Sequence, residues 1–269
     1  MQNMLAQQRH ALILDLLNKN GIVHTADLVK RMGVSSETIR KDVAFLEQGG
    51  HLTRVHGGAV PADNAKSVKA SGRQEASGEY ISFQIRNTQH MEQKAAITNY
   101  AASMIKERQV VALDYGSTSQ MMAEALKKQF KSLTVITNSI QNALILSDCP
   151  DFTIILTGGI LSKEELTLVN DFTQFLDCLH IDILFMTVTG VDPVIGFTDQ
   201  RFSEAKIQNQ MRQAASRTVV LADSSKFGKS SLVKICALKD VDTIITDSGL
   251  PASTEQAIRL AGPELVIVS

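Results

Sequence analysis

Two sets of polar residues in this chain of 269 residues have types and spacings that can do chemistry. The first lies in the segment 35–42, where a helical periodicity separates apolar from charged positions. The charged face is made of Glu37, Arg40 and Lys41. Arginine can bind guanine through two hydrogen bonds, a carboxylate can accept one from cytosine, and lysine can neutralise a phosphate. Such a helix suits the major groove of double-stranded DNA, although a solvated charged face is the ordinary alternative.

The elements around this segment favour a DNA-binding helix. A helix is expected at 7–18, and two short helical patterns meet across a turn at Gly33 and Ser35, with Thr25 and Ser35 as their N-caps. Gly49 ends the second helix, the segment 51–55 alternates like a strand, and the chain turns back as a basic β-wing. The residues expected to contact DNA are Ser36, Glu37, Thr38, Arg40, Lys41, Arg54 and His56.

The second set of polar residues belongs to a longer stretch in which apolar runs alternate with amphipathic helices. Strands are expected at 110–113, 133–137, 153–156, 183–188, 218–222, 243–246 and 265–268. Helices are expected at 95–105, 119–129, 139–147, 172–178, 204–215 and 254–261. This alternation predicts an α/β fold with a mostly parallel sheet covered on both faces.

The loops after these strands are rich in glycine and in hydroxyl, amide and carboxylate side chains. They lie at 114–118, 138–139, 157–159, 189–190, 223–228 and 247–249. Open α/β sheets bind ligands at the carboxyl ends of their strands, and Ser117 and Thr118 start a helix whose free amides attract an anion. Lys226 can add a positive charge, while Asp114 and Asp223 can hold sugar hydroxyls. Any one such loop is more often ordinary turn chemistry, but together they favour a polyol phosphate site.

Both halves of the chain resemble the DeoR family of bacterial transcription regulators. The resemblance rests on 9–16, 38–42 and 54–59 in the first half, and on 114–118, 137–139, 157–159, 204–205 and 222–228 in the second. It implies a winged helix-turn-helix that represses a carbohydrate-utilisation operon, and a sensor domain similar in fold to ribose-5-phosphate isomerase that binds a phosphorylated sugar. The expected effector-binding residues are Asp114, Gly116, Ser117, Thr118, Asn138, Gly158, Gly159, Gly190, Glu204, Gln208, Asp223, Ser225 and Lys226.

The sequence departs from the family pattern at several positions. Lys41 replaces the second of two arginines, and a lysine does not reproduce a guanidinium fork. In the sensor half, Asn170 and Thr187 stand where glycines are usual, and Gln208 stands where a lysine is usual. Lys94 is preceded by a glutamine instead of the family's glutamate.

The charge distribution fits a small, slightly basic DNA-binding domain followed by a larger acidic domain. Residues 1–60 hold seven Lys and Arg against five Asp and Glu, and the remainder holds twenty against twenty-three. We expect a DNA-binding domain at 1–60, a linker at 61–79, and an effector-sensing and oligomerisation domain at 80–269. Cys149, Cys178 and Cys236 lack metal-ligand spacing, so no metal or cofactor is expected. A signal core and membrane span are absent from the pattern, which predicts a cytoplasmic protein.

Three functions remain to be separated. The first is a transcription regulator, not an enzyme, whose partners are a double-stranded operator, a phosphorylated sugar and further copies of itself in a dimer or tetramer. The second is a sugar-phosphate isomerase, for which Asp114, Glu204 and Asp223 are candidate carboxylates. Gln208 can act neither as a base nor as a cation there. The third is a regulator whose degenerate pocket answers to a protein partner or to nothing.

Overall fold

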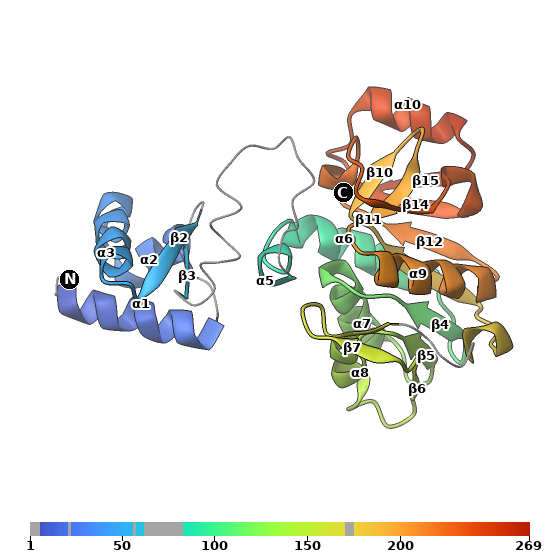
Figure 1. The fold of residues 1–269 in the computed structure, drawn as a ribbon, viewed down its shortest axis with the longest axis horizontal. Coiled ribbons are helices and arrows are strands. Elements are labelled where there is room, and N and C mark those ends of the chain that lie inside the picture. Colours follow the sequence, from blue (N-terminus) through green and yellow to red (C-terminus); the bar gives the residue numbers. More distant parts are fainter. Residues whose placement is uncertain (1–5, 21–22, 56–57, 62–82, 170–174) are drawn as a thin grey trace. The chain divides into compact units, whose positions relative to one another are not determined.

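The computed structural model describes residues 6–20, 23–55, 58–61, 83–169 and 175–269 (Figure 1). The chain divides into two compact units, Met1–Gln84 and Ile85–Ser269, each considered by itself below. Apart from Pro61, the expected linker at 61–79 lies outside the described residues, as do His56 and Asn170. Within the described ranges, none of the helices combines the length and the apolarity that crossing a membrane requires.

The first unit is a winged helix-turn-helix, as predicted. Its elements are α1 (Ala6–Asn20), β1 (Val23–His24), α2 (Thr25–Met32), α3 (Ser36–Gln48), β2 (Leu52–Val55) and β3 (Gly58–Pro61). The three strands form an antiparallel sheet in the order β1-β3-β2, in which β2 and β3 make the wing. The helix α3 is the recognition helix of this arrangement.

Local chemistry explains the turn between α2 and α3. Gly33 takes a φ of 64°, which glycine adopts without steric cost, and its N–H donates to the Val29 carbonyl at 2.9 Å. The Ser35 hydroxyl accepts from the Thr38 N–H at 3.1 Å and caps α3, as predicted. The helix α2 begins at Thr25 itself, so the prediction that Thr25 precedes the helix as its cap was wrong by one position.

The recognition helix is attached to α1 by charge as well as by apolar contacts. Ile39, Val43 and Leu46 are buried in the core of the unit. Asp42, also buried, accepts hydrogen bonds from Arg9 Nε at 2.6 Å and Nη2 at 3.0 Å, and its Oδ1 lies 3.0 Å from His10 Nε2. Burial opposes ionisation, but the hydrogen bonds from Arg9 and His10 outweigh it and lower the pKa of Asp42.

We predict that Asp42→Asn destabilises the first unit by about 2 kcal/mol near neutral pH, because it removes the charge from a buried pair with Arg9. The pKa of Asp42 is lowered by folding, so its contribution is present above the ordinary pKa of about 4 and is lost as the pH falls through the lowered value. Denaturant unfolding at pH 7 and at pH 3 measures both. Asp27→Asn, at an exposed position of α2, is the control, and an equal cost for both variants at pH 7 would contradict the account.

The second unit is built on a seven-stranded parallel sheet in the order β15-β14-β12-β9-β4-β5-β6. The strands are β4 (Val110–Leu113), β5 (Thr134–Thr137), β6 (Thr153–Leu156), β9 (Ile183–Thr187), β12 (Thr218–Leu221), β14 (Thr243–Asp247) and β15 (Glu264–Val268). All seven predicted strands are therefore confirmed, with ends shifted by one residue at most. Continuous runs of branched apolar residues predict buried parallel strands well because both faces of the sheet are covered.

Helices cover the sheet on both faces (Figure 1). They are α6 (Met91–Ala102), α7 (Ser117–Gln129), α8 (Ile140–Leu146), α9 (Phe202–Ala214) and α10 (Ala252–Leu260). Alternate residues of β4 enter different cores: Val111 and Leu113 lie with Met122 and Leu126 of α7, and Ala112 lies in the core that contains Met211 of α9. The residue alternation along each strand therefore separates two apolar layers.

Several short elements complete the unit. A short helix, α5 (Phe83–Arg86), precedes α6, and short 3-10 helices lie at η2 (Phe175–Cys178), η3 (Ser224–Lys226) and η4 (Leu238–Asp240). The strands β7 (Ile160–Ser162) and β8 (Thr167–Val169) pair as a hairpin, and β10 (Gly190–Asp192), β11 (Gly196–Asp199) and β13 (Val233–Cys236) form a second sheet. The sequence pattern predicted none of these five strands. Of the helix expected at 172–178, only Phe175–Cys178 is described, and it is a 3-10 helix.

Candidate functional site

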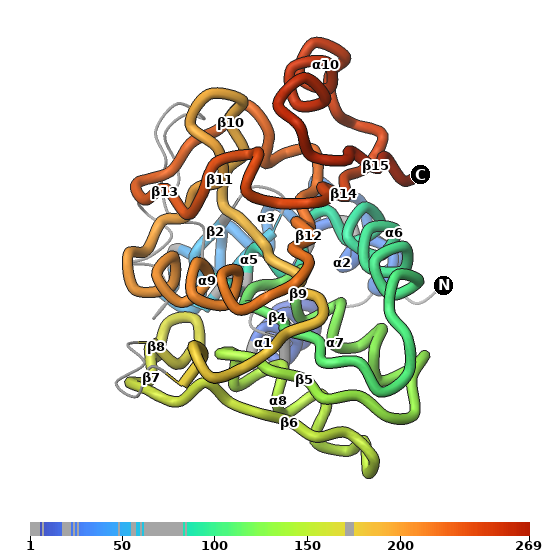
Figure 2. The backbone as a smooth tube through the Cα atoms, turned by 90° about the vertical axis from the view of Figure 1, so that its right-hand side faces the viewer, coloured from blue at the N-terminus to red at the C-terminus, as the bar shows by residue number. Residues whose placement is uncertain are grey.

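The loops that the sequence singled out meet where the order of the large sheet reverses. From β4 the chain continues to β5 and β6 on one side, and later to β9, β12, β14 and β15 on the other. In open α/β sheets such a reversal, at the carboxyl ends of the strands, is where ligands bind. Figure 2 shows β4 next to β9 and β5 in this sheet, with α7 starting directly after β4.

The start of α7 is a potential anion site. Gly116 caps this 13-residue helix with a φ of 117°, and a Cβ there would lie 3.2 Å from Thr187 Oγ1, so the tight turn requires glycine. Ser117 and Thr118 are buried at the first helical positions. Amide groups at a helix start have no partner within the helix and carry partial positive charge, which favours a bound anion.

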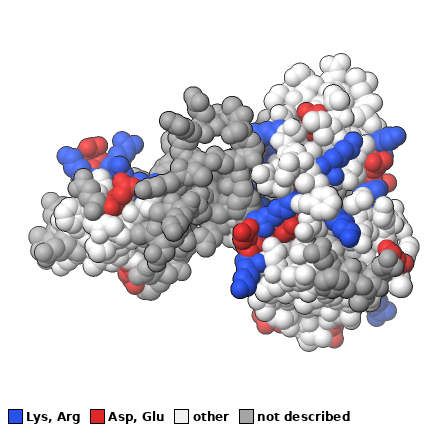
Figure 3. Space-filling model, viewed as in Figure 1, with Lys and Arg blue, Asp and Glu red and all other residues white. Residues whose placement is uncertain are grey.

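Two cationic side chains, Lys94 and Arg86, lie near this helix start, and the charge of Lys226 acts on Lys94. Lys94 Nζ donates to Ser117 Oγ at 3.0 Å and to the Arg86 carbonyl at 2.5 Å. The pKa of Lys94 is lowered to about 8, mainly by burial and also by the charges of Lys226 and Arg86, whereas Asp223 opposes the shift. Burial likewise lowers the pKa of Lys226, and Arg86 contributes to that shift. The charges of Lys226 and Arg86 disfavour the protonated form of Lys94, which a bound anion would favour. Figure 3 shows several Lys and Arg side chains, with Asp and Glu side chains among them, on the visible face of this unit.

Asp114 joins the two halves of the sheet underneath the helix start. Its Oδ2 accepts from the Thr187 N–H at 2.6 Å and from Gln208 Nε2 at 2.9 Å. The Thr187 hydroxyl lies 3.2 Å from Asp114 Oδ1 and donates to the Tyr115 carbonyl at 2.6 Å. Burial raises the pKa of Asp114 to about 8, against the opposing effect of these hydrogen bonds. The raised pKa favours the neutral form of Asp114, whose proton can be donated to the Thr187 hydroxyl.

The neighbouring strand ends carry buried acceptors whose hydrogen bonds are incomplete. Asn138 Oδ1, Thr157 Oγ1 and Asp223 Oδ2 are buried and have no hydrogen-bond partner among the residues that the structure describes. The other carboxylate oxygen of Asp223 accepts from the Ser225 N–H at 3.1 Å and from the Ser225 hydroxyl. Buried acceptors usually have a donor, so these strand ends suit a ligand rich in hydroxyl groups.

The remaining predicted effector residues have other surroundings. Gly158 and Gly159 are exposed, with φ values of 76° and 111°, in the connection from β6 to β7. A Cβ on Gly190 would lie 2.5 Å from the Lys229 carbonyl, so close packing explains this glycine. Glu204 is buried 3.6 Å from Arg201.

Sequence reasoning missed a charged group beside the site. Arg86 Nη2 donates to both oxygens of the buried Glu165 carboxylate, at 2.5 and 2.6 Å, and Arg201 lies 3.7 Å from the same carboxylate. Asp199, whose pKa is raised by burial, accepts from the Tyr115 hydroxyl at 2.9 Å. Lys94 was noted as a family position only, and the sequence carried no signal that pairs Arg86 with Glu165, which lies 79 residues later.

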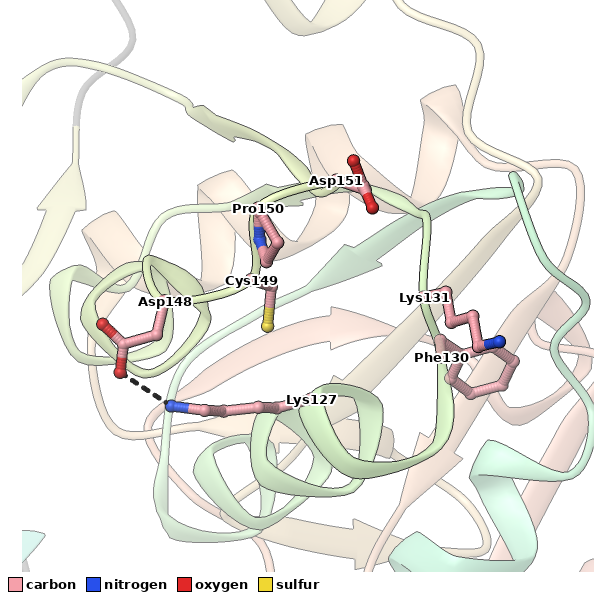
Figure 4. Close-up of a pocket in the computed structure, with 7 residues that line it drawn as sticks. All are labelled: Lys127, Phe130, Lys131, Asp148, Cys149, Pro150 and Asp151. Carbon is pink, nitrogen blue, oxygen red and sulfur yellow. Dashed lines mark hydrogen bonds and ion pairs between the residues drawn. The ribbon is translucent and has the colours of Figure 1, made fainter.

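A surface cavity of about 320 Å³ lies near the other end of α7, away from these residues. Figure 4 shows Lys127 bound to Asp148 at 2.9 Å beside Cys149 in this cavity. Its lining includes none of the predicted effector residues. The candidate site at the strand ends is therefore separate from this cavity. It is identified by its charges and hydrogen-bonding groups.

The residues expected to contact DNA lie on or beside the recognition helix. Ser36, Glu37, Arg40 and Lys41 are exposed on α3. Thr38 is half-buried, and its hydroxyl lies 2.9 Å from the Ser35 hydroxyl of the cap. On the wing, Arg54 Nε donates to Glu47 Oε2 of α3 at 2.6 Å, which ties the wing to the helix. His56 lies outside the described residues.

The sequence matches two family models that agree with this division. Residues 9–65 match the DeoR-like helix-turn-helix domain, and residues 89–248 match the DeoR C terminal sensor domain. The chain belongs to the DeoR family. It is a DNA-binding transcription regulator with a helix-turn-helix domain followed by a sensor domain.

Individual relatives extend over nearly the whole DeoR-family chain. The putative aga operon transcriptional repressor of Escherichia coli O157:H7 is 32% identical over 97% of this chain and 93% of its own length. The lactose phosphotransferase system repressor of Staphylococcus epidermidis is 31% identical over 88% of this chain and 90% of its own. Ribose 5 phosphate isomerase A of Neisseria gonorrhoeae is similar in structure at 16% identity and a TM-score of 0.39, over 52% of this chain and 54% of its own.

We predict that Asp114→Asn becomes more stable relative to the wild type as the pH rises from about 5 to about 8. The pKa of Asp114 is raised on folding, so its stabilisation is complete below the ordinary value and is lost as the pH rises through about 8. Asparagine mimics the neutral acid and keeps donors and acceptors in the same places. The free-energy difference should change by up to about 1.4 kcal/mol per pH unit. Chemical unfolding across this range tests it; Asp151→Asn, at an exposed site, should show no such trend.

Proposed function

We propose that this regulator represses a carbohydrate-utilisation operon and that a phosphorylated sugar bound in the second unit relieves the repression. The observation that supports this most is the position of Lys94 and Arg86 at the start of α7, where Lys94 Nζ donates to Ser117 Oγ and Arg86 Nη1 would lie 3.7 Å from a Cβ built on Gly116. A phosphate would meet free amides and these two positive charges there, and Lys226 is a third cation, whose charge affects the pKa of Lys94. The names of the relatives, which include repressors of an aga operon and of a lactose phosphotransferase system, agree with the substrate class.

The phosphate and the sugar of the proposed effector bind to different groups of the protein. The phosphate lies against the start of α7, where Ser117 and Thr118 begin the helix. The hydroxyls of the sugar face Asn138 and Asp223, whose side chains carry buried acceptors without a partner in the described part of the chain. Asp114 supports the loop from below, since Thr187 and Gln208 already occupy its carboxyl group.

On the DNA side, the proposal assigns base reading to Arg40 and phosphate contacts to Lys41 and Arg54. Arg40 and Lys41 are exposed neighbours on α3, so they point in directions about 100° apart around the helix axis and meet different parts of a groove. Arg54 contacts the DNA backbone from the wing while its Nε keeps its hydrogen bond to Glu47. We further propose a homo-oligomer, a dimer or tetramer, because one helix reads only a short half-site.

We propose that the protein works in the cytoplasm without catalysing a reaction. Two of the three carboxylates that an isomerase could use are engaged by protein groups: Asp114 by Thr187 and Gln208, and Glu204 by Arg201. A buried carboxyl group that already accepts two hydrogen bonds is poorly placed to abstract a proton from a ligand. Turnover of a sugar phosphate by the purified chain would contradict this part of the proposal.

We predict that Arg40→Ala weakens binding to the specific duplex by about 1–3 kcal/mol and reduces the ratio of specific to random affinity. Lys41→Ala should weaken both duplexes about equally, because a phosphate contact carries no base information. Titration of labelled duplexes, one from the gene's own control region and one of random sequence, at two salt concentrations gives both quantities. An unchanged ratio in Arg40→Ala would show that Arg40 does not read a base.

We predict that Thr118→Asp abolishes the stabilisation of the protein by phosphate compounds and leaves DNA binding in their absence intact. The new carboxylate would lie at the second residue of α7 and repel a dianion there. Thr118→Ser keeps the hydroxyl and is the matched control. The measurement is the unfolding temperature with and without a phosphorylated sugar, since a ligand that binds only the folded state raises it. A normal rise in Thr118→Asp would move the phosphate away from this loop.

A further inference from the structure

Arg86 lies between the proposed anion site and a buried carboxylate. One nitrogen of its guanidinium, Nη2, donates to both oxygens of Glu165, at 2.5 and 2.6 Å. The other, Nη1, would lie 3.7 Å from a Cβ built on Gly116, so it reaches the turn at which α7 starts. The Glu165 side chain is 1% exposed and that of Arg86 is 20% exposed. One cation is therefore shared between an internal carboxylate and the place where an external anion would bind.

The carboxylate is held in place by an unfavourable backbone conformation. Glu165 lies in the turn between β7 and β8, and the next residue, Leu166, has a φ of 52°. A bulky residue rarely adopts this left-handed conformation unless its surroundings impose it. The Leu166 carbonyl accepts from the Ile140 N–H at 2.9 Å, at the start of α8. The hairpin turn is thus anchored in the conformation that presents Glu165 to Arg86.

Arg86 is also the residue through which the site reaches α5. Its side chain meets Glu165, and its carbonyl accepts from Lys94 Nζ at 2.5 Å, while the same Nζ donates to Ser117 Oγ. Arg86 ends α5, and the chain before α5 leads back in sequence to the helix-turn-helix unit. An anion that binds Lys94 would therefore act on the Arg86 carbonyl, and one that binds Arg86 would act on its guanidinium. Because Arg86 is the last residue of α5, either contact would act on the end of this helix.

We propose that Glu165 is an internal competitor for Arg86, and that a bound phosphate signals to α5 by drawing Arg86 away from it. The inference rests on the proposed effector site. A phosphate offers a guanidinium the same paired oxygen acceptors as a carboxylate but with more charge, so the exchange is chemically matched. Glu165 would keep Arg201, now 3.7 Å away, as a cationic neighbour, so that its buried charge stays compensated. Glu165 lowers the apparent affinity for the anion, because it stabilises the state in which Arg86 is occupied.

The neighbouring Glu164 provides a matched control. Its side chain is 75% exposed and pairs with Arg201 at 2.7 Å, so Glu164→Gln makes the same chemical change one residue away. Binding of inorganic phosphate to the full-length chain is measured by calorimetry. Glu165→Gln should bind phosphate about tenfold more tightly than the wild type, the effect of losing one charge-assisted competitor, and Glu164→Gln should stay within about twofold. Hydrogen exchange at residues 83–89 should change on adding phosphate to the wild type and be changed already in Glu165→Gln without it.

The outcomes separate this inference from the proposed function. If the wild type binds phosphate but Glu165→Gln behaves like Glu164→Gln, Glu165 is not a competitor and the inference fails while the anion site stands. If neither the wild type nor Glu165→Gln binds phosphate, the anion site itself is wrong. Should Glu165→Gln not fold, Glu165→Asp carries the test: its shorter side chain keeps the charge but cannot reach Arg86 with both oxygens. It should also bind phosphate more tightly, and wild-type affinity in that variant would overturn the inference.

Discussion

The second unit depends on the hydrogen bonds of the Asp114 carboxyl group at the reversal of strand order. Its bond to the Thr187 N–H joins the ends of β4 and β9, the two strands from which the sheet grows in opposite directions. The Asp114 carbonyl accepts from Ser119 and Asn142 at 2.9 and 2.8 Å, so the same residue fixes the first turn of α7 and reaches α8. Gly116 can hold its left-handed turn because these contacts determine the backbone on both sides. The proposed anion site at the start of α7 depends on this buried network.

Charge pairing has a comparable role in the first unit. Arg9 of α1 forms an ion pair with Asp42 of α3, which follows Arg40 and Lys41 in the sequence. This ion pair fixes the orientation of the helix face that carries Arg40 and Lys41. Both units thus use a buried carboxyl group to position the residues proposed to contact DNA or the effector. In Asp42 the partner is a cation, which lowers the pKa; in Asp114 the partners are neutral, and burial raises it. The hydrogen bond from Gln208 lowers the pKa of Asp114, but this neutral amide carries no charge and does not outweigh the effect of burial.

The sequence predicted the architecture because its signals were local. Apolar runs such as Val110–Leu113 marked the parallel strands, and Ser35 and Gly33 marked the turn of the helix-turn-helix. Short strands such as Ile160–Ser162 were missed, since three residues carry no measurable alternation and their pairing comes from tertiary contacts. The sequence predicted the loops that form the candidate site, but it did not predict which charged side chains pair with one another there. Pairs such as Arg86 with Glu165 are formed by the fold, and no regular spacing in the sequence indicates them. The role of Asp114 in supporting the loop follows from its burial, which the sequence does not show.

The central claim is that a phosphate group, bound where α7 begins, controls the affinity for DNA. The most direct measurement is the affinity of the full-length chain for the duplex from its own control region, with a panel of sugar phosphates and with their unphosphorylated parent sugars. The account predicts that at least one phosphorylated sugar lowers the affinity for this duplex about tenfold or more, a usual size for coupling between two sites, while its parent sugar has no effect. A parent sugar as effective as its phosphate, or a panel without effect on DNA binding, would contradict it.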